Sequence, residues 1–224
     1  MPTALILGAS RGLGLGLAHE LTDRGWTVIG TVRSEHDRPA LEAAGAAVEV
    51  ADITDPASIK ALRHAVSDQL AGPLDLLFVN AGIAGPTHQS ASEMTEEEAS
   101  TLFYTNAVAP IASARTFLDL LPDGGVLAFM SSQLGSVTNA AGTMALYSAS
   151  KAALNSMTRA MAAQLDRPLT VLSLHPGWVR TDMGGEGADL DVHTSTRGLV
   201  DVIVARRGTP GSAFLDYKGD ELPW

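Results

Sequence analysis

Short apolar runs alternate with longer amphipathic segments along the whole chain. Within each run the apolar residues are nearly continuous, which is typical of strands that are buried on both faces of a parallel sheet. The runs lie at residues 3–7, 27–32, 46–50, 74–79, 125–130, 169–174 and 212–217. The pattern therefore predicts seven strands.

Segments with helical periodicity separate these strands. They lie near residues 12–24, 55–71, 94–120 and 145–166, with weaker ones near 37–44 and 195–205. The repeated order of strand, helix and strand predicts a doubly wound α/β fold, in which helices flank both faces of a seven-stranded, mostly parallel sheet. No linker or low-complexity tract divides the chain, so we expect residues 1–224 to form one domain. Residues 184–198, rich in glycine and polar residues, are predicted to be a mobile loop beside a site.

The composition excludes several classes of protein. Of the 224 residues 46% are hydrophobic and 18% are charged, and no apolar run approaches the roughly 18 residues that span a bilayer. The start of the chain shows no secretory leader, so we expect a cytoplasmic protein without membrane insertion. Without cysteines the chain has no disulfides or thiolate metal sites, and we predict no metal. The net charge of −10 argues against nucleic acid as a partner.

A glycine-rich turn joins the first predicted strand to the first helix. The sequence GASRGLG supplies Gly8, Gly12 and Gly14, with Ser10 and Leu13 between them. Such a turn lets a diphosphate approach the main chain, and the following helix offers unpaired N–H groups to it. The alternative is that the glycines merely close a tight turn. The position after the first strand favours a dinucleotide site.

Two arginines bear on the choice of cofactor. Enzymes that prefer NAD often place an acidic residue at the end of the second strand, but this chain has Arg33 there. Together with Arg11 in the glycine turn, Arg33 suits a 2′-phosphate, which favours NADP(H) over NAD(H). The alternative is two solvated surface arginines, because Glu35 and Asp37 lie close by in the sequence.

Polar residues also follow the next strands of the predicted sheet. Asp52 and Ile53 come just after the third strand, and Asn80, Ala81 and Gly82 come just after the fourth. Open α/β sheets bind ligands at the carboxyl ends of their strands. We therefore expect these residues to border the same cofactor.

Tyr147 and Lys151 are four residues apart in a predicted helix, so they share one helical face. An ammonium group close to a phenol favours the phenolate, and we expect the pKa of Tyr147 to fall toward neutrality. That change would make the phenol a usable general acid or base. The alternative is a packed tyrosine with a lysine extended to solvent beside it.

Other residues support the catalytic interpretation. The fifth strand ends in Ser131 and Ser132, either of which can donate a hydrogen bond to a carbonyl oxygen. In the preceding helix, Asn106 lies four residues before Pro110, which has no N–H to continue the helical hydrogen bonds. We expect a distortion there that frees backbone groups for a water molecule.

Taken together, these features resemble the short-chain dehydrogenase/reductase family over essentially the whole chain. The resemblance rests on GASRGLG, the NAG of residues 80–82, Asn106, Ser132, Tyr147-x-x-x-Lys151 and HPGWVRTDM at 175–183. It implies a Rossmann fold and a dinucleotide-binding oxidoreductase. Within the family, HPGWVRTDMGG and FLDYKGDELPW are most similar to the C-factor-like and sniffer-like carbonyl reductases.

The resemblance also implies a role for each catalytic candidate. Tyr147 transfers the proton to or from the substrate oxygen, and Ser132 polarises that oxygen. Lys151 binds the nicotinamide ribose and lowers the pKa of the tyrosine, while Asn106 holds a water of the proton relay. Ser132 is chosen over Ser131 because relatives show Ser-x-x-Gly, which Ser132 and Gly135 match.

For the cofactor, the resemblance places the segment from Pro176 to Thr181, which includes Gly177 and Val179, on the nicotinamide side. Leu7 and Val79 depart from the family pattern, and we expect only a small cost in local hydrogen bonding. The interval of 15 residues between Ser132 and Tyr147 is slightly longer than in many relatives. The family further implies a homodimer or homotetramer, through the helices near 94–120 and 145–166.

The sequence thus predicts an NADP(H)-dependent oxidoreductase that reduces a small-molecule ketone or aldehyde by hydride transfer. Two alternatives remain, an NAD-linked alcohol dehydrogenase and an NADP(H)-binding sensor or signalling protein. Six residues are expected to line the substrate pocket, although packing explains Trp178 equally well. These residues are Gln133, Leu134, Asn139, Met144, Trp178 and Met183.

Overall fold

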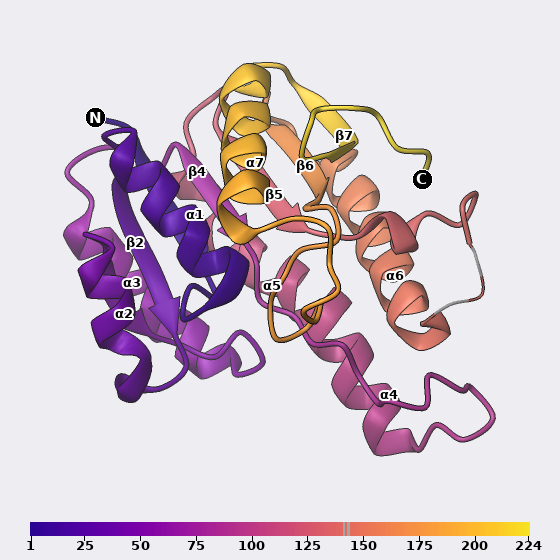
Figure 1. The fold of residues 1–224 in the computed structure, drawn as a ribbon. Helices are drawn as coiled ribbons and strands as arrows, with labels where there is room; N and C mark the ends of the chain where they lie inside the picture. The colour runs from indigo at the N-terminus through magenta and orange to yellow at the C-terminus, as the bar shows by residue number, and fades with distance from the viewer. Residues whose placement is uncertain (141, 143) are drawn as a thin grey trace.

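One parallel sheet forms the centre of the computed structural model, which describes residues 1–140, 142 and 144–224 (Figure 1). Within these residues the sheet has seven strands in the order β3-β2-β1-β4-β5-β6-β7. Their bounds are β1 Thr3–Leu7, β2 Thr27–Val32, β3 Ala47–Val50, β4 Leu76–Val79, β5 Val126–Met130, β6 Thr170–His175 and β7 Gly211–Asp216. All neighbouring strands pair in parallel, where a mostly parallel sheet was expected.

Helices cover both faces of this sheet. One face packs against α1 (Gly12–Asp23), α2 (Arg38–Ala43) and α7 (Val192–Arg206). The opposite face packs against α3 (Pro56–Gln69), α5 (Ala109–Phe117) and α6 (Ala145–Ala162). In Figure 1, α4 (Glu96–Phe103) projects away from the sheet. The predicted doubly wound α/β fold is confirmed.

The chain reverses its direction of winding between β1 and β4, which are neighbours in the sheet. Strands β2 and β3 lie on one side of this point, and β5 to β7 lie on the other. In open α/β sheets, ligands bind outside the carboxyl ends of the strands at such a switch point. The fold therefore predicts a ligand site at the loops that follow β1 and β4.

The predicted helix at 94–120 is interrupted. A π-helical turn, Tyr104–Val108, separates α4 from α5, and a 3-10 turn follows at Leu118–Leu120. In the π turn the N–H of Ala109 bonds to the carbonyl of Tyr104, five residues earlier. Pro110 is the physical reason, because it cannot donate the N–H that the carbonyl of Asn106 would accept in an α-helix. The expected distortion before Pro110 is thus present as a π turn.

The expected mobile loop at 184–198 was partly wrong. Its second half belongs to α7, which begins at Val192 and not near residue 195. The side chain of Asp191 caps this helix by accepting the N–H of Thr194. The buried face of its first turns carries Ser195 and Thr196, and these polar residues hid the helical periodicity. In the first half, Leu190 pairs with Val179 in a bridge, and the mobility of residues 184–190 stays a prediction.

No helix in the described part of the chain has the length and apolar character to cross a membrane.

Candidate active site

The glycine turn after β1 is closely packed. Gly8 and Gly12 adopt positive φ angles of 89° and 54°, which side-chain-bearing residues rarely do. A Cβ added at Gly14 would lie 2.1 Å from the carbonyl oxygen of Gly8. Arg11, the residue before α1, makes no side-chain cap, so the first N–H groups of the helix are open to a ligand. Ser10 and Leu13 are half-buried on this turn.

The loop after β4 packs directly against that turn. The Asn80 side chain donates a 2.6 Å hydrogen bond to the carbonyl of Gly8. A Cβ on Gly8 would lie 2.9 Å from Ala81, so glycine is what allows the two loops to approach. The structure therefore brings together the glycine turn and the Asn80–Ala81–Gly82 segment, as the sequence predicted.

The segment after β6 reaches the same place. A Cβ on Gly12 would lie 3.5 Å from the methyl group of Thr181. The hydroxyl of Thr181 accepts the N–H of Gly184, which closes a turn in this segment. Nearby, Gly177 has a φ of 81° and Val179 is buried. The Pro176 carbonyl is held by the hydroxyl of Ser195 at 2.6 Å.

The two candidate phosphate-binding arginines differ. Arg11 forms an ion pair with Asp182, so it pairs across the site and does not join Arg33. Arg33 is exposed at the end of β2, and no ion pair involves it among the described residues. The carboxylate of Glu35, which is close to Arg33 in the sequence, instead forms an ion pair with Arg38 at 2.7 Å. Arg33 is therefore free to meet an anion.

The acidic loop after β3 is well ordered by its own hydrogen bonds. The carboxylate of Asp52 accepts both the N–H and the hydroxyl of Thr54, at 2.8 and 2.7 Å. Ile53 is buried against the sheet face that α3 covers. These contacts place the loop at the carboxyl end of β3, beside β2.

Tyr147 and Ser132 meet although 15 residues separate them. Ser132 follows β5 and is buried, and its hydroxyl lies beside the Tyr147 phenol. Burial raises the pKa of Tyr147 to about 12, and the neighbouring Ser132 hydroxyl acts in the opposite direction. The loop between them, 133–146, includes residues 141 and 143, which lie outside the described part of the chain.

Lys151 lies one helical turn after Tyr147, buried in α6. Its Nζ donates a 2.8 Å hydrogen bond to the carbonyl of Met130 and lies 5.7 Å from the centre of the Tyr147 ring. Burial lowers the pKa of this amine from 10.5 to about 8. Met130 is its one hydrogen-bond partner among the described residues, so two of its three donor positions are open.

The expected fall in the Tyr147 pKa was wrong for this structure. The pKa of the phenol rises, because removing a phenolate from water outweighs the other influences on it. Lys151 itself pays a desolvation cost in the same environment, and its pKa falls. The prediction from spacing counted the attraction between the two charges and omitted their shared burial.

Asn106 lies in the π turn and is fully buried. Its Oδ1 accepts the N–H of Ile83 at 2.8 Å, and its Nδ2 donates to the Ile83 carbonyl at 2.8 Å. Gly82, just before Ile83, is in contact with two of the candidates. A Cβ there would lie 3.2 Å from Asn106 Oδ1 and 3.3 Å from Lys151 Nζ. The structure thus brings Asn106 and Lys151 to the same loop.

Two polar residues in α6 were missed by the sequence reasoning. Ser150 accepts a hydrogen bond from Asn106 Nδ2 at 3.0 Å and donates to the Tyr147 carbonyl at 2.7 Å. Asn155 accepts the hydroxyl of Ser131 at 2.7 Å. Ser131 is therefore committed to an internal bond, whereas Ser132 faces the phenol. The position of Ser150, three residues after Tyr147 in a predicted helix, was the one feature of the sequence that could have indicated this contact.

Most of the residues expected to line a substrate pocket are exposed at the protein surface. Met144, Trp178 and Met183 are large exposed apolar residues. Trp178 does not pack into the core; its indole N–H donates to the Gly184 carbonyl at 2.8 Å. Gln133 and Asn139 are exposed and Leu134 is half-buried.

The buried charge of Lys151 predicts a specific pH dependence of stability. Its pKa is about 8 when folded and 10.5 when unfolded, so the unfolded state binds more protons between these values. The penalty is fully present below pH 8 and disappears as the pH rises to 10.5. We expect the stability of Lys151→Met, relative to the unmodified protein, to fall by about 3 kcal/mol across that window.

Urea unfolding at a series of pH values measures this difference. Lys60→Met is the matched control, because Lys60 is exposed on α3 and its substitution removes no buried charge. A constant stability difference for Lys151→Met from pH 7 to 10.5 would show that the amine is not buried in its charged form.

Comparison with protein-family models identifies this chain as similar to the short chain dehydrogenase model, which matches residues 2–189. Among curated proteins, it is 37% identical to C-signal of Myxococcus xanthus over 169 residues, covering 73% of this chain and 100% of that protein.

Solved structures agree over the full length. A short-chain dehydrogenase/reductase from Burkholderia multivorans with bound NADP is 40% identical, with a TM-score of 0.94 and coverage of 100% of this chain and 99% of that one. A carbonyl reductase from Pseudomonas aeruginosa in complex with NADP is 40% identical, with a TM-score of 0.92. Carbonyl reductase Sniffer of D. melanogaster is 32% identical, with a TM-score of 0.89. The Pseudomonas and Sniffer matches cover 100% of both chains.

Proposed function

Because this chain belongs to the short-chain dehydrogenase/reductase family, we propose that it is an NADP(H)-dependent oxidoreductase that reduces a ketone or aldehyde to an alcohol. The observation that carries the proposal is the meeting of Ser132, Tyr147 and Lys151 at one site. The Ser132 hydroxyl lies beside the Tyr147 phenol and acts to lower its pKa, and a buried amine lies one turn along the same helix. Structural similarity to carbonyl reductases with bound NADP supports it.

The residues present fit a dinucleotide. The contact between Gly14 and Gly8 leaves no room for a side chain, so the turn exposes main chain at the open end of α1. Such an arrangement is suited to a diphosphate. Lys151 has donor positions to spare for ribose hydroxyls, and Arg33 is free for a 2′-phosphate.

Bound NADPH supplies the hydride in this chemistry. The protein contributes the proton and the orientation of the substrate. Ser132 donates a hydrogen bond to the substrate oxygen, and Tyr147 donates the proton to that oxygen as negative charge develops on it. Lys151 holds the ribose, and Asn106 fixes the loop that carries Gly82 against the amine. As the family resemblance implies, Asn106 also holds the water that returns a proton.

The raised pKa of Tyr147 favours the reductive direction. With a pKa of about 12, the phenol carries its proton throughout the neutral range. It therefore holds the proton that carbonyl reduction consumes, although burial also makes it a weaker acid, whereas alcohol oxidation requires a phenolate that burial disfavours.

Arg33 distinguishes NADP(H) from NAD(H). We expect Arg33→Ala to weaken NADPH binding about tenfold or more, because one charge-assisted hydrogen bond contributes about 1.5–3 kcal/mol, and to leave NADH binding unchanged. Arg33→Lys should retain part of the affinity, since it keeps the charge and loses the planar fork. The change in Trp fluorescence during titration measures the affinity of the protein for each cofactor. Equal effects on NADPH and NADH would favour the NAD-linked alternative.

The direct test is consumption of NADPH in a panel of ketones, aldehydes and quinones, with NADH in parallel. The proposal expects turnover of at least one carbonyl class with NADPH. It fails if neither cofactor changes the Trp fluorescence or the melting temperature of the protein.

The proposal extends to the organisation of the protein. Residues 1–224 act as one dinucleotide-binding oxidoreductase unit, supported by a single sheet whose strands run from Thr3 to Asp216. We place it in the cytoplasm as a homodimer or homotetramer. The exposed apolar side chains of Tyr104 and Val108, on the π turn, support association of copies through this helical region.

A further inference from the structure

We propose that Gln89 is a positioning residue for Tyr147, which acts by capping helix α6 from a distant loop. The inference rests on the proposed function, because it assigns Gln89 to the reaction that Tyr147 performs. It also makes a separate claim about the helix, which can be tested without any turnover.

In the described part of the chain, the residue that precedes helix α6 provides no side-chain cap. Its first helical residue is Ala145, and the preceding Met144 has a φ of 47° and makes no side-chain cap. The first N–H groups of a helix have no partner within the helix, and a cap usually serves the second or third of them. In α6 the third of these positions is Tyr147 itself.

Gln89 supplies the missing acceptor. Its Oε1 accepts the N–H of Tyr147 at 2.9 Å, although the two residues are 58 positions apart. Its Nε2 donates to the carbonyls of Ala84 and Pro86, at 3.1 and 2.7 Å. One amide side chain thus joins its own loop to the main chain of Tyr147.

The backbone at Gln89 is strained in a way that this contact explains. Its φ is 51°, in the left-handed region that residues other than glycine rarely occupy. Strain of this kind costs about 1–3 kcal/mol and persists where the surroundings impose it. The three hydrogen bonds of the half-buried Gln89 side chain provide that constraint.

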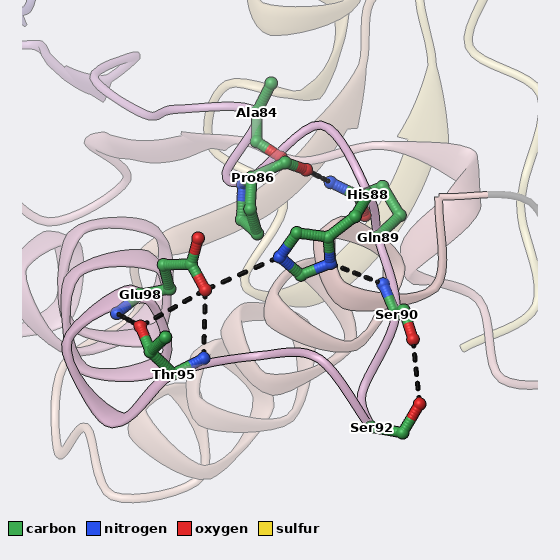
Figure 2. Close-up of polar contacts among 8 residues, drawn as sticks. All are labelled: Ala84, Pro86, His88, Gln89, Ser90, Ser92, Thr95 and Glu98. Atoms are coloured by element: carbon green, nitrogen blue, oxygen red, sulfur yellow. Dashed lines mark hydrogen bonds and ion pairs between the residues drawn. The ribbon is translucent and has the colours of Figure 1, made fainter.

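Neighbouring contacts fix the loop itself, as Figure 2 shows. His88 Nδ1 accepts the N–H of Ser90 at 3.0 Å, and His88 Nε2 lies 3.4 Å from the Glu98 carboxylate. Glu98 is also part of the capping box of α4, where it accepts the N–H of Thr95. The side of the loop opposite α6 is therefore anchored to another helix.

The chain segment that runs from Asn80 to Gln89 also contacts the glycine turn and Asn106. From Asn80 it contacts the glycine turn, and Ile83 is held by both polar atoms of the Asn106 side chain. Six residues later Gln89 holds Tyr147. Rigid connection of this segment to α6 sets the distance between the phenol and the Asn106 side of the site.

The test compares Gln89→Leu, which removes all three hydrogen bonds, with Gln89→Glu, which keeps an acceptor for the Tyr147 N–H. We expect Gln89→Leu to lower kcat about tenfold, because small displacements of a catalytic group cost rate, and to leave the KM for NADPH within about twofold. Gln89→Glu should recover a clear part of the lost kcat. Hydrogen exchange should show a faster Tyr147 amide in Gln89→Leu and a protected one in Gln89→Glu.

Gln164→Leu is the matched control. Gln164 lies just beyond the opposite end of α6, where its side chain accepts a hydrogen bond from Arg115. It should leave kcat and the Tyr147 amide unchanged. A Gln89→Leu protein with unchanged kcat, or with an unchanged Tyr147 exchange rate, would overturn the inference. If the unmodified protein reduces no carbonyl, the proposed function fails, and the exchange rates still decide whether Gln89 caps α6.

Discussion

Replacement of Tyr147 by phenylalanine is expected to lower kcat for carbonyl reduction by about a thousandfold, because positioned acid–base groups contribute about 10²–10⁴ in rate. The variant should bind NADPH normally, since it removes only the phenol oxygen and keeps the ring beside Lys151. Stability should change by less than about 1.5 kcal/mol, because the substitution keeps the ring and one hydrogen bond contributes about 0.5–1.5 kcal/mol. Steady-state kinetics and thermal melting measure the two effects.

Tyr104→Phe is the control for this substitution. Tyr104 lies on the π turn, and the substitution keeps the ring that the proposed association of copies uses, so the loss of its hydroxyl should not affect the rate. Normal turnover by Tyr147→Phe would remove the phenol from the mechanism. If a cellular role survives while NADPH turnover is lost, the sensor alternative gains support over the enzymatic one.

The second large effect is expected from Gly14→Ala. The added methyl group would lie 2.1 Å from the carbonyl oxygen of Gly8 and 2.6 Å from Asn80 Nδ2, so the glycine turn must move apart from the β4 loop. We expect a loss of about 3 kcal/mol or more in the free energy of unfolding, at the upper end of the range for overpacking. NADPH affinity should fall at least about tenfold, because the displaced main chain no longer fits the diphosphate.

Urea unfolding and fluorescence titration check this result. Gly72→Ala is the matched control, because a Cβ there meets no atom within 4 Å and its backbone is not left-handed. Unchanged stability and affinity in Gly14→Ala would contradict the packing described for the turn.

The strands could be predicted from the sequence within two residues at each end. The reason is physical: strands covered on both faces need apolar residues at nearly every position, and turn residues mark where they stop. The run at 76–79 is an example, since all four residues of β4 are buried.

The helices were harder to predict from the sequence where their buried faces are polar or their geometry is irregular. Ser195 and Thr196 are buried at the start of α7, and their hydroxyls donate hydrogen bonds to backbone carbonyls. The sequence therefore shows no apolar stripe that would predict this part of the helix. The π turn at Tyr104–Val108 adds one residue per turn without changing composition. Pro110 alone signalled it.

In the site, residues linked by local spacing or by family motif could be predicted, as with Tyr147 and Lys151. The contact of Gln89 with Tyr147 could not, because it depends on a left-handed backbone and spans 58 positions. The direction of the Tyr147 pKa shift was also beyond the sequence. It depends on how deeply the phenol is buried, which only the assembled loops determine.

The hydrogen bond between Asn80 and Gly8 has a consequence for folding kinetics. These residues are 72 positions apart, and their contact closes a loop that contains β2, β3 and the helices between β1 and β4. Closure of such a long loop is slow, because its entropy cost precedes its contacts. We therefore expect this contact to form late in folding. A cofactor that binds across it should stabilise the protein mainly by slowing unfolding.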